Sequence, residues 1–446
     1  MFWTLQACLG SSDHSCISQP NKGEKSVRIG MFESQSLTAG GSKPKQHSMT
    51  TQKSIVVVGA GPAGLRAAEV AAELGARVVL CDGQPSAGRK FLIAGRGGLN
   101  LTHAEPVEKF PDRYRDERER WRDLLGAFGP DALRAWAEKL AIETYVGTSN
   151  RVFPRGQKAA VLLRAWLKRL RAAGVEFVPS ARLVRLMKEE NRWNLQFQDG
   201  TLRQAEAVIL ALGGASWPET GSDGHWPSLL KPHGIEIAPF LPANCGWNVA
   251  WPATVLERAE GLPLKNLHVT AGNEAVAGEL LITRYGLEGG AIYRLGPVLR
   301  RMPQPKITID FKPQVSAEIL LERAAASRQS EQWWRTWKLS TGAIALLQGF
   351  FPAETDAAMM VRHLKNFPIS LKSPRPIAEA ISTAGGVSWR ELDRRLMLHK
   401  MPGVFLAGEM IDWEAPTGGY LLQGCFSTGT RAGESAAAFL TNAVAG

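Results

Sequence analysis

Cysteine is scarce and scattered in this chain. The five cysteines, Cys8, Cys16, Cys81, Cys245 and Cys425, form no CxxC pair. An odd and scattered set provides neither a disulfide framework nor the ligand spacing of a zinc site. We therefore predict no metal centre and no disulfide-reducing activity. Unpaired cysteines fit a reducing compartment, so a cytoplasmic protein is expected.

Long apolar runs and acidic residues are also in short supply. No window reaches the roughly 18 consecutive apolar residues of a membrane-spanning helix, so we expect no membrane segment. The 44% hydrophobic and 21% charged residues exclude fibrous and wholly disordered classes. Basic residues outnumber acidic ones by 53 to 42, giving a net charge of +11. This balance favours an anionic partner: nucleic acid, an anionic membrane surface or a polyanionic cofactor.

The first 48 residues differ in composition from the rest. They are rich in Ser, Gly, Gln and Lys without periodicity, which predicts a disordered extension. Met49 then opens a segment typical of a protein start, so our hypothesis is that residues 1–48 follow from a misassigned start codon. They hold five basic and three acidic residues, so the remaining chain keeps a net charge of +9.

A glycine-rich turn follows the first apolar strand. Residues 54–58 are rich in β-branched residues and predict a buried parallel strand, and GAGPAG at 59–64 opens a predicted helix over 61–74. Gly59 permits the tight turn, Gly61 the approach of a pyrophosphate, and Gly64 close packing of the helix. Asp82 directly follows the second strand, 76–81, where a carboxylate can accept ribose hydroxyls. This arrangement predicts dinucleotide binding, with FAD or NAD preferred over NADP.

The remaining pattern is α/β with an interruption. Residues 121–140 predict a helix broken at Gly129-Pro130, 157–173 an amphipathic helix, and 175–178 a strand. Segments 183–188, 193–198 and 207–212 predict a meander with a turn at Asp199-Gly200. From 235 to 377 short strands alternate with Pro/Gly turns, which indicates an inserted domain. A strand at 403–407 and a helix at 427–440 return to α/β character.

Five further motifs carry a family resemblance. They are AGRKFLIAGRGGLNLTH at 87–103, ILALGGASWPETGSDG at 209–224, ITRYGLEGGAIY at 282–293, TAGGVSWRELD at 383–393 and the glycine-rich stretch at 403–433. In this order they resemble a bacterial flavoprotein family, labelled NAD(FAD)-utilizing dehydrogenases or aminoacetone-oxidase-family FAD-binding enzymes. The chain is similar to the branch with the AGRGGLNLTH loop. Leu99 stands where the commoner branch has cysteine, which disfavours thiol chemistry there.

The resemblance implies FAD as the resident cofactor. It also implies a three-layer, Rossmann-like FAD domain of the glutathione-reductase type, in parts 49–234 and 378–446, interrupted by a β-barrel-plus-helices insert at 235–377. The helix starting near Ser427-Thr428-Gly429 is expected to face the flavin with its N-terminus. The residues expected to bind the cofactor are Gly59, Gly61, Pro62, Ala63, Gly64, Asp82, Arg89, Lys90, Arg96, Gly97, Asn100, Leu101, Gly213, Gly214, Gly408, Glu409, Asp412, Gly418, Gly419, Tyr420 and Gln423.

Candidates for acid–base chemistry are few. Tyr285, in the insert, and His103, after the GRGGLN loop, are the predicted catalytic residues; each has the alternative of an ordinary structural role. His225 is a weaker candidate, and Cys425 is expected to pack beside the flavin. A second GxGxxG motif is absent, so NAD(P)H is expected to bind only transiently as a donor.

Two basic stretches leave the substrate open. The helix at 157–173 carries Arg164, Lys168 and Arg171 on one face, besides Lys158 and Arg169, and no acid. The insert adds Arg362, Lys365, Lys372 and Arg375, near Trp333, Trp334 and Trp337. These are solvated faces and core aromatics, or an RNA-binding surface. The prediction is an FAD-dependent oxidoreductase acting on a small organic substrate; the alternatives are an RNA-modifying flavoenzyme reducing a pyrimidine, and a non-enzymatic FAD-bound redox sensor. The oligomeric state stays open.

Overall fold

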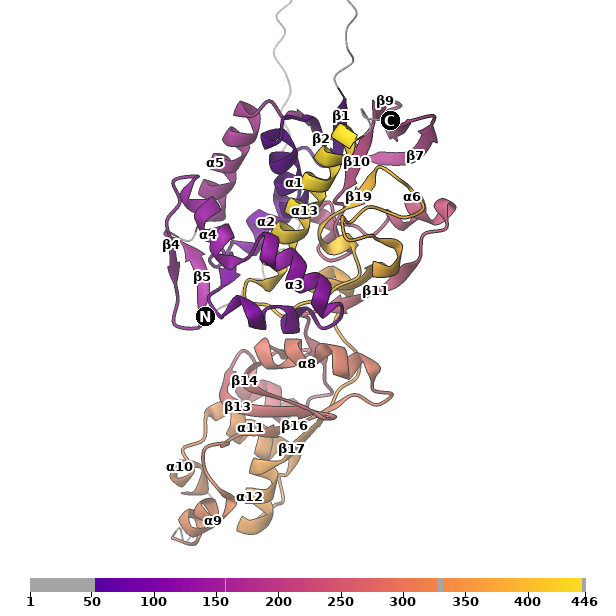
Figure 1. Cartoon of the computed structure of the whole chain (residues 1–446). Coiled ribbons are helices and arrows are strands. Elements are labelled where there is room, and N and C mark those ends of the chain that lie inside the picture. Colours follow the sequence, from indigo (N-terminus) through magenta and orange to yellow (C-terminus); the bar gives the residue numbers. More distant parts are fainter. Residues whose placement is uncertain (1–52, 157, 327–331, 443–446) are drawn as a thin grey trace, which may run out of the picture. The chain divides into compact units, whose positions relative to one another are not determined.

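The computed structural model describes residues 53–156, 158–326 and 332–442 (Figure 1). The predicted extension at 1–48 lies outside the described residues. In the described ranges no helix is long and apolar enough to cross a membrane.

A five-stranded parallel sheet forms the centre of the cofactor-binding part. Its order is β19-β10-β1-β2-β6, made of β1 (Ser54–Val58), β2 (Arg77–Cys81), β6 (Glu176–Val178), β10 (Ala207–Leu210) and β19 (Val404–Leu406). All five strands were predicted. Apart from β6 and the first residues of β1 and β2, the strand side chains are apolar and buried, because helices or a second sheet cover each side.

The prediction that 207–212 belongs to the meander is wrong. Those residues form β10, which pairs in parallel with β1, with Val57 opposite Ile209. The meander is completed by β9 (Leu202–Ala205), which the pattern did not reveal, after β7 (Leu183–Glu189) and β8 (Arg192–Phe197). The burial explains the difference: β10 is buried on both faces, whereas β8 alternates between buried and partly exposed positions.

Helices cover one face of the sheet. The meander packs into the hydrophobic core on the other face. The first core contains α1 (Pro62–Glu73), α4 (Pro130–Glu138), α5 (Ala159–Ala172) and α13 (Tyr420–Asn442). The second contains the meander, α3 (Arg118–Ala127) and α6 (Pro227–Leu230). The predicted break at Gly129-Pro130 is confirmed, since it separates α3 from α4. This is a three-layer Rossmann-like fold.

Helix α13 begins seven residues earlier than predicted. It starts at Tyr420, so Ser427 and Thr428 are buried inside the helix and are not its N-terminus. Low helix propensity of glycine led to the wrong start. In the structure the glycines of α13 allow it to pack closely on α1: a Cβ on Gly429 would lie 2.5 Å from the carbonyl oxygen of Ala63 in α1. Figure 1 shows α1 and α13 side by side.

Residues 235–377 contain an antiparallel sheet, unlike the parallel sheet of the cofactor-binding part. The strands β12 (Trp247–Asn248), β15 (Gly286–Glu288), β14 (Glu274–Ile282), β13 (Pro263–Ala271), β16 (Lys306–Asp310) and β17 (Phe367–Ser370) form an antiparallel half-barrel in that order. After β17, Lys372 and Arg375 donate backbone hydrogen bonds of 2.8 Å each to Asn248 and Gly246, which joins the last strand to the first.

Helices complete this core. They are α7 (Ala253–Ala259), α8 (Gly290–Arg301), α9 (Ala317–Ala325), α10 (Trp333–Thr336), α11 (Thr341–Phe350) and α12 (Ala357–Lys365). Trp333 and Trp337 are buried in this core, which confirms their interpretation as core aromatics. The antiparallel strands β11 (Ile237–Ala243) and β18 (Ser382–Val387) lie where the chain leaves and rejoins the cofactor-binding part. We keep 235–377 as our proposal for the insert.

Candidate functional site

The turn between β1 and α1 uses its three glycines differently. Gly59 has φ +104°, and a Cβ there would lie 2.3 Å from the carbonyl oxygen of Ala211. A Cβ on Gly64 would lie 1.8 Å from the carbonyl oxygen of Gly59. A Cβ on Gly61 would meet nothing within 4 Å. Gly59 and Gly64 are therefore required by packing, whereas Gly61 keeps space open for something outside the protein.

The N-terminus of α1 faces this space without a side-chain cap. Gly61 is the N-cap residue and Pro62 occupies the first helical position. The free N–H groups of the first turn and the positive end of the helix dipole are thus available to an anion. Asp82 is close by: its carboxylate accepts hydrogen bonds from the backbone N–H groups of Ala60 (2.6 Å) and Gln84 (2.7 Å). Burial raises the pKa of Asp82.

These groups line a cavity of about 210 Å³. Its wall continues through α2 (Arg89–Ala94), the loop after β10, the loop after β19 and the first turns of α13. The Nε atom of Arg89 is buried there without a hydrogen-bond partner among the described residues. Ten residues expected to bind the cofactor line this cavity: Gly59, Gly61, Pro62, Ala63, Asp82, Arg89, Lys90, Gly213, Gly408 and Glu409.

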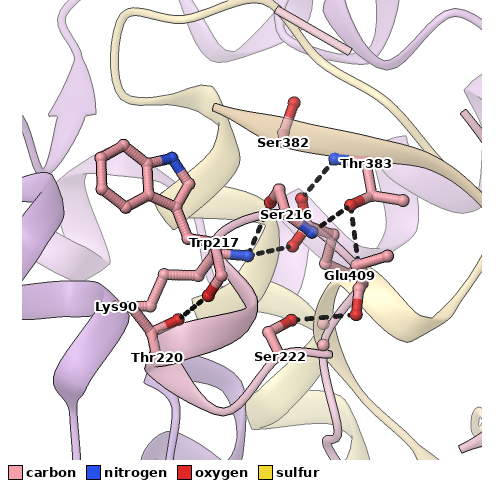
Figure 2. Close-up of polar contacts among 12 residues, drawn as sticks. Lys90, Ser216, Trp217, Thr220, Ser222, Ser382, Thr383 and Glu409 are labelled. Atoms are coloured by element: carbon pink, nitrogen blue, oxygen red, sulfur yellow. Dashed lines mark hydrogen bonds and ion pairs between the residues drawn. The ribbon is translucent and has the colours of Figure 1, made fainter. Parts of the chain in front are cut away.

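A polar network supports one side of the cavity (Figure 2). Lys90 contacts Glu409 (Nζ to Oε2, 3.2 Å) and donates to Ser216 Oγ (2.8 Å). The other oxygen of Glu409 accepts the backbone N–H of Thr383 (2.9 Å). The Thr383 hydroxyl in turn accepts the backbone N–H groups of Ala215 (2.9 Å) and Ser216 (3.1 Å). Four segments distant in sequence thus fix the position of Lys90 and Glu409.

Sequence reasoning missed Ser216 and Thr383, although both belong to motifs that carry the family resemblance. Only their place in these motifs could have pointed to a site, because an isolated serine or threonine does not indicate one. Ser222, which donates to the carbonyl oxygen of Gly214 (3.0 Å), was missed for the same reason.

Other expected cofactor residues do not line the cavity. Gln423 is fully buried, donates to the carbonyl oxygen of Phe128 (2.9 Å) and accepts the Thr102 hydroxyl (2.8 Å). Asp412 accepts the backbone N–H of Gly385 (3.1 Å), and burial raises its pKa. The full set away from the cavity is Gly64, Arg96, Gly97, Asn100, Leu101, Gly214, Asp412, Gly418, Gly419, Tyr420 and Gln423.

Tyr420, at the start of α13, belongs to a separate cluster with His103. Its hydroxyl donates to Glu105 (2.7 Å), which also accepts Arg113 Nε (2.8 Å), and its ring stacks on that of His103 at 5.2 Å. Burial alone would raise the pKa of Glu105, but the hydrogen bonds from Arg113 and Tyr420 hold it below its ordinary value. Burial lowers the pKa of His103. Glu105 and Arg113 were missed because they lie in a stretch without a motif.

Tyr285 lies in the insert, in contact with a carboxylate. Its hydroxyl donates to Glu288, which also accepts the hydroxyl of Tyr293 at 3.4 Å. The Arg375 guanidinium lies 4.2 Å from the centre of the Tyr285 ring. Burial and the neighbouring Glu288 raise the pKa of Tyr285. Tyr285 does not line the cavity near α1.

The environments of His225 and Cys425 do not favour a catalytic role. His225 is 81% exposed and contacts Asp223 (3.3 Å), which is a surface arrangement. Cys425 lines the cavity, and burial raises the pKa of its thiol to about 12. The thiol therefore stays protonated near neutral pH, which is a poor state for a nucleophile.

Comparison with known proteins identifies the family. The HI0933-like protein Rossmann domain matches residues 53–435. The chain belongs to this family. It is 26% identical over 410 residues to 3-dehydro-bile acid delta(4,6)-reductase of Clostridium scindens, covering 86% of this chain and 98% of that protein. It is 25% identical over 397 residues to ribosomal RNA dihydrouridine synthase of Escherichia coli, covering 84% and 95% respectively.

A solved structure with similar coverage is 3-ketosteroid-delta4-(5alpha)-dehydrogenase from Rhodococcus jostii. It has a TM-score of 0.46 and 17% identity, and the match covers 88% of this chain and 99% of that one.

This HI0933-like protein is a flavoprotein oxidoreductase with a Rossmann FAD-binding domain. The residues present suit that cofactor. The uncapped N-terminus of α1 and the space at Gly61 suit a pyrophosphate, Asp82 suits a ribose, and the Nε of Arg89, which has no partner among the described residues, suits an anionic group.

Proposed function

We propose that this protein is an FAD-dependent reductase that passes a hydride from NAD(P)H to an activated carbon–carbon double bond of a small organic substrate. The observation that carries the proposal is the cavity at α1. An uncapped helix N-terminus, Gly61 and Asp82 face it together, in a chain that spans nearly the whole length of a reductase relative.

Each group around the cavity has a proposed task. The N–H groups of the first turn of α1 bind the pyrophosphate, and Asp82 accepts the ribose hydroxyls. Lys90, held by Glu409 and Ser216, supplies positive charge beside them. Bound FAD supplies the hydride chemistry. The sequence has no second GxGxxG, which supports NAD(P)H as a transient donor and not as a second resident nucleotide.

Reduction of a double bond also consumes a proton, and we assign its delivery to Tyr285. This phenol is protonated at neutral pH, as an ordinary tyrosine is, and Glu288 fixes the direction of its hydroxyl. A short stretch of backbone connects Tyr285 to the cavity wall. Ile381 lines the cavity, and its backbone N–H donates to the carbonyl oxygen of Asn244 (3.3 Å). Gly246, two residues after Asn244, lies beside the Tyr285 ring. His103 is the alternative acid–base residue.

The test separates hydride entry from proton delivery. FAD-loaded protein is reduced anaerobically with NADPH or NADH and then mixed with a 3-dehydro-Δ4,6 bile acid, and mass spectrometry follows the gain of two hydrogens. We expect Tyr285→Phe to accept hydride at the wild-type rate but to reduce the substrate about 100-fold more slowly. His103→Gln is the matched variant, and slowing only in that variant would contradict the assignment to Tyr285. Absence of flavin reduction and of turnover with any acceptor would favour the redox-sensor alternative.

A second candidate function is reduction of a pyrimidine base in RNA. The relative named ribosomal RNA dihydrouridine synthase and the unpaired basic face of α5 support it. The same mixing experiment with uridine-containing RNA, followed by nucleoside mass spectrometry, tests it directly. Conversion of uridine and not of the bile acid would favour this second candidate.

A further inference from the structure

The chain from residue 151 to 171 is basic and free of acids. It carries seven Lys or Arg residues and no Asp or Glu. Two of the seven have acidic partners: Arg169 contacts the buried Glu69, and Arg155 contacts Glu143 at 2.7 Å. The other five are exposed and have no acidic partner in the part of the chain that the structure describes: Arg151, Lys158, Arg164, Lys168 and Arg171.

Three of these charges form a stripe along α5. Arg164, Lys168 and Arg171 share the outer face of the helix over about 10 Å of its length. The opposite face is buried through Leu162, Leu163, Trp166 and Leu170. Arg171 also lies 5.3 Å from the centre of the Phe177 ring, which orders its guanidinium at the end of the stripe.

A pair of aromatic rings continues the surface on the β4–β5 hairpin, formed by β4 (Thr144–Val146) and β5 (Arg151–Pro154). Tyr145 and Phe153 are register partners, their rings stack with centres 5.8 Å apart, and both are half-buried. Val152 and Pro154 are buried, so the alternation of β5 places Phe153 on the same outer face as Arg151. Partly exposed rings beside cations are the usual platform for unpaired bases.

This surface reaches the edge of the cofactor-binding part. β5 pairs with β3 (Thr102–His103), where Arg151 lies opposite His103. A Cβ on Gly95, just after α2, would lie 2.3 Å from Ala159 of α5, and α2 lines the cavity. The hairpin and α5 therefore border the elements that surround the cavity.

We propose that the outer face of the β4–β5 hairpin and α5, hereafter the β5–α5 face, binds single-stranded RNA. The five unpaired cations contact phosphates, and an unpaired base stacks on Tyr145 and Phe153. The proposal deepens the second candidate function and rests on it for the choice of RNA. A bilayer fits less well, because Val161 is the one large apolar side chain of α5 with substantial exposure, at 42%.

The basic stretch of the insert provides the contrast. Lys365 contacts Asp310 (2.7 Å), Arg375 contacts Glu379 (2.7 Å), and Trp333 and Trp337 are buried in the core. Trp334 stays partly exposed, but only Arg362 and Lys372 of the four cations lack an acidic partner among the described residues, so this stretch supplies the control.

The experiment measures binding of FAD-loaded full-length protein to a labelled oligouridylate by fluorescence anisotropy across salt concentrations. Five phosphate contacts predict a log–log salt slope of about −3.5, and Arg164→Glu with Lys168→Glu should reduce its magnitude by about 1.4. The control, Arg362→Glu with Lys372→Glu, changes the net charge equally and should leave the slope unchanged. Phe153→Leu keeps an apolar side chain and should weaken binding about tenfold.

Three results would overturn the proposal. They are equal weakening by both charge-reversal pairs, equal affinity for an oligothymidylate, and binding to anionic phospholipid vesicles in place of RNA. The flavin spectrum and NADPH reduction of each variant report folding and cofactor binding separately. RNA binding that persists without any base reduction would refute the second candidate function alone and leave the β5–α5 face intact.

Discussion

At the scale of single residues, one residue type serves two physical purposes in the phosphate-binding turn. Gly59 and Gly64 are glycines because neighbouring carbonyl oxygens leave no room for a Cβ, and Gly61 is a glycine although the protein itself leaves room. The sequence predicted the packing roles of Gly59 and Gly64, since they follow from local spacing, and the role of Gly61 stays a prediction. It did not reveal Glu105 or Thr383, because a single carboxylate or hydroxyl becomes part of a cluster only through long-range folding.

Substitution of these glycines separates stability from cofactor binding. Gly61→Ala has an ordinary φ of −76° and open space, so we expect an unchanged melting temperature and FAD affinity at least about tenfold weaker. Gly64→Ala places a Cβ against Gly59 and should lower the free energy of unfolding by about 1–3 kcal/mol. Thermal unfolding of the apoproteins and flavin titration measure the two effects. Tight FAD binding by Gly61→Ala would contradict this assignment of the cavity.

Glu105 predicts a pH dependence. Its pKa is held below the ordinary value, so its stabilising effect is present above the unfolded pKa of about 4.3 and is lost as pH falls through the lower folded value. Glu105→Gln should therefore destabilise the protein by about 2 kcal/mol at neutral pH. The gap between wild type and variant should close under acidic conditions. Urea unfolding at several pH values tests this, and a gap that widens towards acid would refute it.

At the scale of elements, local patterns predicted the strands and helices well, but not their partners. The run 54–58 before GAGPAG indicated β1 because its signal is local. β10 was found but joined to the wrong sheet, because pairing with Ile55–Val58 is set by contacts about 150 residues apart. The start of α13 was missed because helix propensity counts glycine as unfavourable, whereas the tight packing against α1 requires it.

At the scale of the whole molecule, the insert meets the cofactor-binding part through charged contacts. Arg300 of α8 contacts both carboxylate oxygens of Glu414, at 2.8 and 2.7 Å. Glu414 directly follows Trp413, which lines the cavity. Such long-range pairing gave no sequence signal. The contact between Arg300 and Glu414 holds the insert beside the cavity wall.

We expect Arg300→Met to loosen this attachment. The substitution leaves Glu414 without its hydrogen-bonding cation and should lower the free energy of unfolding by about 2 kcal/mol. FAD binding should be unchanged, because Arg300 lies outside the cavity wall, while substrate reduction should slow. Hydrogen exchange of α8 and turnover assays measure these effects, with Lys372→Met as the control. Wild-type exchange and turnover in Arg300→Met would show that the contact does not hold the insert.

We infer that the cavity at α1 holds an FAD that accepts hydride from a transient nicotinamide donor. Anaerobic titration of the FAD-loaded protein with NADPH and NADH, followed by the visible flavin band, tests it most directly. We expect stoichiometric bleaching by at least one donor in the wild type, and weak flavin retention by Gly61→Ala. A protein that takes up no FAD, or whose bound flavin stays oxidised with both donors, would contradict it.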